Sequence, residues 1–356
     1  MLKTWIKFSA GLGGLLAAGA LILLAAEAAV RFQPVQAPAP APGDFVSVLV
    51  DERLFTVFAA LNALGYDAHG FDLPYHPARQ AARDYLAGRR LPSLERLRWQ
   101  LSTAAPYPAV VWALHFGGPP KFPRQAAGWH NPKLPALLFF GLDAALRDFY
   151  READLGALWL RVQPLYEAEA AAYRREAPAA VQAALDYARL AEPGAGRVVV
   201  IPNLLDAYYS GYGPDLAGTA YVVVGPTENG PDASLVRHEA NHSFIGPLVQ
   251  ANLSAVEPAR AERLQTALRG GVQGAYGTWE SFLEECVVRA VDARLAPPEW
   301  RENGLRQADE AGLRLTRPLA EKLVEYEASG GSLADFMPAL LASLNRLEPQ
   351  ALAAQP

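Results

Sequence analysis

A short apolar strand, a polar turn and a helix follow one another between Gly218 and Pro247. The strand "GTAYVVVG" is rich in β-branched residues, as buried strands are, and "PTENGPD" is a cluster of turn-forming residues. Asp232 is expected to be the N-cap of a helix that runs through Phe244. Gly246 and Pro247 supply a stop signal for that helix. This succession predicts a β-sheet with the helix packed on it.

Helical patterns dominate the rest of the chain. The clearest runs from Leu165 to Leu190, where Pro178 is expected to break or kink the helix. Short strands are expected at Phe45–Val50 and Arg197–Ile201, whereas Tyr107–Phe116 fits either a strand or a buried helical turn. The sequence therefore predicts an α+β fold that is mainly helical, with a small β-sheet on the histidine-bearing helix and a helical C-terminal part.

Two histidines bracket a glutamate in "SLVRHEANHSFIGP". His238 and His242 are one helical turn apart, so both rings project from one face about 6 Å apart and can bind one metal ion. This is the His-Glu-x-x-His pattern of zinc hydrolases, in which the glutamate is a general base rather than a ligand. Zinc is the expected cofactor, and Glu239 the expected base. The alternative is that these residues satisfy one another structurally, or that they belong to a site that has lost its metal.

A catalytic zinc site needs a third protein ligand. A metzincin continuation would place glycine and histidine where the chain has Ile245 and Leu248, and the single Cys286 excludes a cysteine cage. Only one Glu-x-x-His pair occurs, which disfavours a di-iron site. No histidine follows His242, so a third histidine would have to come from upstream, from His69, His76, His115 or His130.

An acidic third ligand downstream is the simpler interpretation. The helical stretch "TWESFLEECVVRAVDARL" embeds two glutamates among apolar residues, and buried carboxylates need a metal or a charge partner. We expect Glu285 to be the ligand, with Glu284 the next candidate and Glu280 after it. Arg289, four residues beyond Glu285, is placed to neutralise or orient it, and Asp292 to be the partner of a ligating histidine. The alternative is that the glutamates face water.

The segments "RHEANHSF" and "EECVVRA" together resemble the gluzincin class of zinc metallopeptidases, and more narrowly a group of predicted bacterial metallopeptidases. The resemblance covers roughly residues 197–295 and implies a zincin-like fold with a zinc-binding core at about 196–295. It implies His238, His242 and Glu285 as zinc ligands and Glu239 as general base. It also implies that the strand before the zinc helix, Ala220–Gly225, pairs with the substrate backbone; the alternative is an ordinary buried strand. The thermolysin-like surroundings of the third ligand are absent.

Peptide hydrolysis needs a donor that stabilises the developing oxyanion. Tyrosines in two glycine-rich segments, "AYYSGYG" and "GAYGTW", are candidates. Tyr212 is the first of them, with Tyr209 and Tyr276 as alternatives. Packing is the competing role for an aromatic residue in such a loop.

The N-terminus is typical of an export segment. Two lysines precede an uncharged run from Phe8 to Ala26, and small residues follow. The run is long enough to span a bilayer, so residues 1–30 are expected to be either a cleaved signal peptide or a membrane anchor. An Ala/Pro spacer is expected at 31–44, and a catalytic domain at 45–350.

The net charge of the chain bears on which classes of partner it can bind. The net charge of −5 gives no sign of a basic face for nucleic acid, so no nucleic-acid partner is expected. The sequence thus predicts an exported zinc-dependent metallopeptidase, periplasmic or extracellular, that acts on a peptide or protein substrate and contacts the membrane if its N-terminus is uncleaved. The alternatives are a non-catalytic envelope protein on a metallopeptidase fold and a zinc hydrolase of a non-protein substrate.

Overall fold

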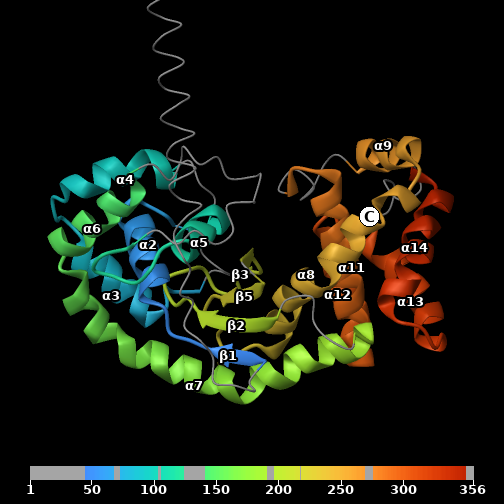
Figure 1. Cartoon of the computed structure of the whole chain (residues 1–356), viewed down its shortest axis with the longest axis horizontal. Coiled ribbons are helices and arrows are strands. Elements are labelled where there is room, and N and C mark those ends of the chain that lie inside the picture. Colours follow the sequence, from blue (N-terminus) through green and yellow to red (C-terminus); the bar gives the residue numbers. More distant parts are fainter. Residues whose placement is uncertain are drawn as a thin grey trace, which may run out of the picture. The chain divides into compact units, whose positions relative to one another are not determined.

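The computed structural model describes residues 45–67, 73–102, 106–123, 141–190, 196–216, 218–268 and 276–349 (Figure 1). Residue contacts divide the described chain into two compact units. The first contains Val50–Ala168 and Pro202–Ser210, and the second contains Asp44–Leu49, Glu169–Ile201 and the chain from Gly211 onward. The domain boundaries expected from the sequence stay a prediction.

The first unit is built from helices around an aromatic and aliphatic core. Phe55, Phe58 and Trp112 are at most 1% exposed within it. Tyr107–Phe116, which the pattern left open between strand and helix, is largely helical. The helices are α2 (Glu52–Ala63), α3 (Pro77–Leu86), α4 (Pro92–Ser102), α5 (Pro106–Leu114), α6 (Leu142–Glu152) and residues 155–168 of α7 (Leu155–Ala188).

The second unit contains a small mixed sheet in the order β1-β2-β5-β3, with β4 also paired to β5. β1 and β2 are parallel, while β3 and β4 run antiparallel to β5. β5 therefore has neighbours on both sides. The expected pairing of Ala220–Gly225 with substrate is wrong, because β3 and β4 occupy the edge that a substrate strand would need. The strands are β1 (Val46–Val48), β2 (Arg197–Pro202), β3 (Gly211–Tyr212), β4 (Asp215–Leu216) and β5 (Thr219–Val224).

Helix α8 (Ala233–Ala251) packs on β5 and lies along α11 (Trp279–Leu295) (Figure 1). Asp232 caps α8 by accepting hydrogen bonds from the backbone N–H groups of Ser234 and Leu235, and Thr278 caps α11 in the same way through Ser281. The other elements of this unit are residues 169–188 of α7, η2 (Leu253–Ala255), α9 (Pro258–Ala267), α12 (Pro298–Glu310), α13 (Thr316–Ala328), α14 (Leu333–Ala342) and η3 (Ser343–Arg346).

Two expected helix breaks do not occur. α8 continues through Gly246 and Pro247 to Ala251, and α7 is unbroken at Pro178. Pro247 is exposed while Val249 beyond it is buried, so packing of the last turn outweighs the backbone hydrogen bond that the proline removes.

The mainly helical α+β fold predicted from the sequence is confirmed, with twelve α-helices and a five-stranded sheet among the described residues. Over the same residues, no helix combines the length and apolarity needed to cross a membrane. The expected export segment and the Ala/Pro spacer lie outside the described residues.

Candidate metal centre

Helix α8 directs its two histidines toward α11. The ring centroids of His238 and His242 are 5.1 Å apart, and the ring planes are nearly perpendicular. Both Nε2 atoms face the carboxylate of Glu285, at 3.8 Å from His238 and 3.3 Å from His242. One ligand atom from each of these three residues lies within 4.8 Å of the other two. The structure therefore brings together the three residues that the sequence predicts as ligands, and they could hold a metal ion.

Each histidine is oriented by a carboxylate of α11. The Nδ1 atom of His238 lies 2.6 Å from Oδ2 of Asp292, and Nδ1 of His242 lies 3.0 Å from Oε1 of Glu284. An acceptor at Nδ1 favours the tautomer in which Nδ1 carries the proton and Nε2 has a free lone pair. Both rings are thus held with Nε2 toward Glu285, as a lone pair when the ring is neutral and as an N–H donor when the ring is protonated. This orientation is the one that metal binding requires.

Glu285 is held by the helix that bears it. Its side chain is 5% exposed, and Arg289 one turn later donates from Nε to Oε1 at 2.5 Å. Burial opposes the charge on Glu285, but the hydrogen bond from His242 and the nearby cationic groups of His238 and Arg289 outweigh it, so the pKa of this carboxyl lies well below its usual range. Glu285 therefore remains an ionised oxygen donor.

Glu239 lies beside the two histidines and its side chain is 8% exposed. Oε1 of Glu239 is 4.0 Å from Nε2 of His238. Burial raises the pKa of this carboxyl, and the two histidines offset only part of that effect. A carboxylate whose pKa is raised holds a proton more strongly than a free carboxylate, which suits the predicted general base.

The charges around the histidines do not balance while both rings are neutral. Four carboxylates approach the rings, and two guanidinium groups pair with them, Arg289 with Glu285 and Arg237 with Asp292 at 3.6 Å. With neutral histidines, these groups leave two negative charges in a largely buried cluster, to which the carboxyl of Asp215, coupled electrostatically to His242 and Glu284, is a further acidic neighbour. One divalent cation, or two protons on the histidines, would neutralise these two charges. Protonation agrees with the raised pKa of both rings: burial lowers each pKa, but the neighbouring carboxylates raise it by more.

The pairing of Glu284 with His242 is a contact that the sequence does not predict, because the sequence indicates Glu284 only as an alternative ligand. The signal lies in Gly246, one turn after His242 on α8. A Cβ at Gly246 would lie 2.9 Å from Oε1 of Glu284. The glycine that was interpreted as a helix stop instead leaves room for a carboxylate to approach the helix.

The predicted tyrosine donors differ in their surroundings. Tyr212 lies in β3, paired with Val223, and its catalytic role stays a prediction. Tyr276 lies near Glu285 and Arg289; burial and the charge of Glu285 raise the pKa of its hydroxyl, which therefore stays a donor at neutral pH. Tyr209 belongs to the first unit and has a positive φ of 58°.

Neither of the other two described histidines belongs to the group that could hold a metal ion. His76 caps α3, and Nδ1 of His115 lies 2.7 Å from the carbonyl oxygen of Val111; both belong to the first unit. His69 and His130 lie outside the described residues. Glu280 is in the first turn of α11 and is not part of the cluster that could hold a metal.

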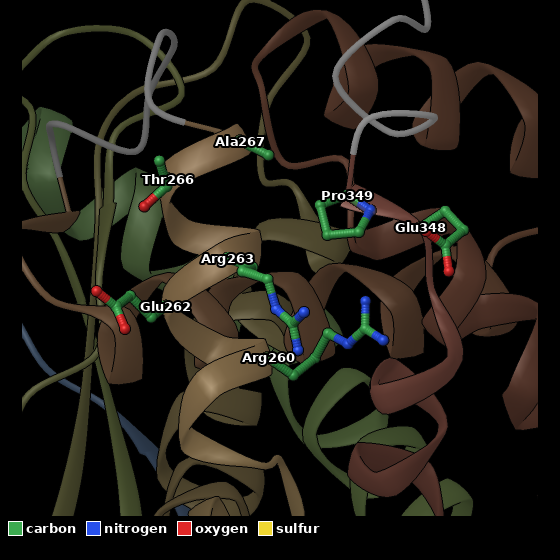
Figure 2. Close-up of a pocket in the computed structure, with 7 residues that line it drawn as sticks. All are labelled: Arg260, Glu262, Arg263, Thr266, Ala267, Glu348 and Pro349. Carbon is green, nitrogen blue, oxygen red and sulfur yellow. The ribbon is translucent and has the colours of Figure 1, made fainter.

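A separate pocket of about 650 Å³ lies in the second unit between α9 and the C-terminal segment (Figure 2). It contains none of the predicted site residues. Two arginines and two glutamates give it a mixed charge. It is lined by Arg260, Glu262, Arg263, Thr266, Ala267, Glu348 and Pro349.

The residues on α8 and α11 define a candidate centre for one metal ion, with two histidines and one glutamate as donors and a second, buried glutamate alongside. Comparison of the chain with known protein families, curated proteins and solved structures finds no match.

Proposed function

We propose that this chain is an exported zinc-dependent peptidase of the gluzincin type. The observation that carries the proposal is the convergence of His238, His242 and Glu285, with the Nδ1 atom of each histidine held by its own carboxylate. Two histidines and one glutamate are a donor set of catalytic zinc, which keeps a fourth position open. Tetrahedral zinc ligands at about 2.0–2.2 Å from the ion are roughly 3.3–3.6 Å from one another. The separations of Nε2 from the Glu285 carboxylate, 3.3 Å for His242 and 3.8 Å for His238, are close to this range.

In this proposal Nε2 of His238, Nε2 of His242 and the carboxylate of Glu285 hold the ion, and Asp292 and Glu284 keep the rings in the ligating tautomer. Zinc bound there would supply Lewis acidity, which polarises a carbonyl group and makes water acidic enough to react near neutral pH.

Glu239 moves the proton. It accepts a proton from the attacking water as the new C–O bond forms, and it delivers that proton to the peptide nitrogen as the C–N bond breaks. Its burial supports this role, because burial raises the pKa of the carboxyl. A carboxylate with a raised pKa accepts the proton of water more readily than a free carboxylate does. It still releases that proton to the more basic amine that leaves, more readily than a lysine would. Tyr276 is the tyrosine whose surroundings best suit an oxyanion donor, because its hydroxyl stays protonated beside Glu285.

Export is proposed from the N-terminal sequence alone, and a peptide substrate from the resemblance. The test is a peptide-library digest by full-length protein reconstituted with zinc, compared with Glu239→Gln. The variant should keep its zinc and lose about 10²- to 10⁴-fold in kcat, the usual contribution of a general base. Glu280→Gln, on α11 outside the cluster, is the matched control.

Retained turnover in Glu239→Gln would refute the assigned base. If the wild type binds zinc but cleaves no peptide, the chain is a binding protein rather than a peptidase. Turnover of other esters or amides alone would keep a hydrolase and change its substrate class.

A further inference from the structure

The segment from Gly211 to Gly213 passes directly against Glu239. A Cβ at Gly211 would lie 2.2 Å from Oε1 of Glu239 and 2.8 Å from its Cδ. A Cβ at Gly213 would lie 2.5 Å from the backbone oxygen of Glu239 and 3.3 Å from Oε2. Contacts this short exclude any side chain at either position without a shift of its neighbour.

Space, rather than backbone conformation, requires glycine here. Neither Gly211 nor Gly213 has a positive φ, in contrast to Gly218 in the turn before β5. An L residue could therefore adopt the backbone at both positions. Only the proximity of Glu239 forbids it.

The strand cannot retreat from Glu239 at low cost. Gly211 pairs with Val224 and Tyr212 with Val223, and β4 is paired to β5 immediately afterwards. On the other side, Glu239 is fixed by a helix that packs on the same β5 strand. The carboxylate is therefore confined between a paired strand and the two histidines.

On the basis of the proposed function, we propose that Gly211 and Gly213 are positioning residues for the general base. Their backbone forms a wall that holds the carboxylate of Glu239 facing the Nε2 atoms of the histidines. Because side chains alternate along an extended strand, Tyr212 between them points to the opposite side of β3. This strand thus acts on the site through the glycines that flank the tyrosine.

The two glycines meet different parts of Glu239, so their substitutions have different consequences. A methyl group at 211 meets side-chain atoms only, and it would displace the carboxylate while α8 and the ligands stay in place. A methyl group at 213 meets the backbone oxygen, and it would have to move the strand or the helix. Gly211→Ala should therefore affect catalysis most, and Gly213→Ala stability most.

The first measurement is a thermal-unfolding cycle on metal-free full-length protein. Gly211→Ala should lower Tm by roughly 3–6 °C in the wild type, the usual cost of overpacking, and by much less in a Glu239→Ala background, where the carboxylate is gone. Gly213→Ala should lower Tm in both backgrounds, because residue 239 keeps its backbone oxygen. Gly330→Ala, which lies outside any helix and where a Cβ meets no heavy atom within 4 Å, is the matched control.

The second measurement is catalytic. Zinc-loaded Gly211→Ala should bind one zinc ion per chain and lose about 10²-fold in kcat, as expected for a displaced catalytic group, with little change in KM. An equal Tm loss from Gly211→Ala in both backgrounds, or an unchanged kcat, would overturn the inference. The unfolding cycle needs no substrate, so it decides the positioning role even if the wild type proves not to be a peptidase.

Discussion

Asp292 offers a direct test of how the ligand geometry is maintained. Its Oδ2 lies 2.6 Å from Nδ1 of His238, and its Oδ1 accepts a hydrogen bond from Asn241 at 3.2 Å. Arg237 lies 3.6 Å from the same carboxylate. Replacing Asp292 by asparagine keeps a similar shape and an acceptor but removes the charge. We therefore expect Asp292→Asn to weaken zinc binding without unfolding the protein.

The magnitude follows from the hydrogen bond to His238. Hydrogen bonds to charged groups contribute about 1.5–3 kcal/mol and neutral ones about 0.5–1.5 kcal/mol. The loss of charge should thus cost about 1–1.5 kcal/mol, which is roughly a 5- to 13-fold increase in the Kd for zinc. Asp292→Ala also removes the acceptor and leaves Arg237 without its carboxylate, so its effect should approach about 100-fold, the upper range for such partners.

The assay is a competition titration with a chromophoric zinc chelator at fixed pH and salt. Glu284→Gln should give a smaller increase in Kd than Asp292→Asn, because its contact with His242 is longer, at 3.0 Å. Glu280→Gln on the same helix is the control and should leave Kd unchanged. An unchanged Kd in Asp292→Ala, or an equal loss in the control, would refute the reasoning.

Three further predictions concern other parts of the chain. The part-buried ring of His76 has its pKa lowered to about 4 by burial, so the folded state favours the neutral form; stability should fall as pH drops from about 6.5 to about 4, by about 1–3 kcal/mol in total, and then level off. Denaturant unfolding at pH 7, 5 and 4 should show this loss in the wild type and not in His76→Asn, which keeps a capping acceptor; parallel curves would refute it. Tyr276→Phe should lower kcat by about 10²-fold if its hydroxyl stabilises the oxyanion, whereas Tyr212→Phe should leave kcat within about threefold, and the reverse order would exchange their roles. Arg189 donates at 2.7 Å to two carbonyls that follow the C-terminal end of α13, so Arg189→Met should cost about 1–2 kcal/mol of unfolding free energy, and an unchanged Tm would contradict that role.

Local rules were sufficient for the parts of the site that lie on single helices. A capping aspartate, Asp232, and the one-turn spacing of His238 and His242 are properties of a helix alone. The spacing of Glu285, Arg289 and Asp292 likewise places them along one face of α11. The sequence could therefore predict which residues gather.

Features that depend on contacts between segments distant in the sequence could not be predicted from local patterns. Whether Gly246 ends a helix or admits Glu284 is decided by how closely α11 packs on α8, which no local pattern contains. The same holds for Gly211 and Gly213, whose reason for being glycine is a side chain on another element. The sequence leaves open whether β5 is an edge strand or a buried one, because β3 and β4 are only two residues long and give no periodic signal.

The central claim is that His238, His242 and Glu285 bind one zinc ion. Elemental analysis of full-length protein, purified with zinc present and then dialysed, measures this directly. The account predicts one zinc ion per chain in the wild type and none in the His238→Ala/His242→Ala double variant. Wild-type protein without zinc, or a double variant that retains it, would contradict the account.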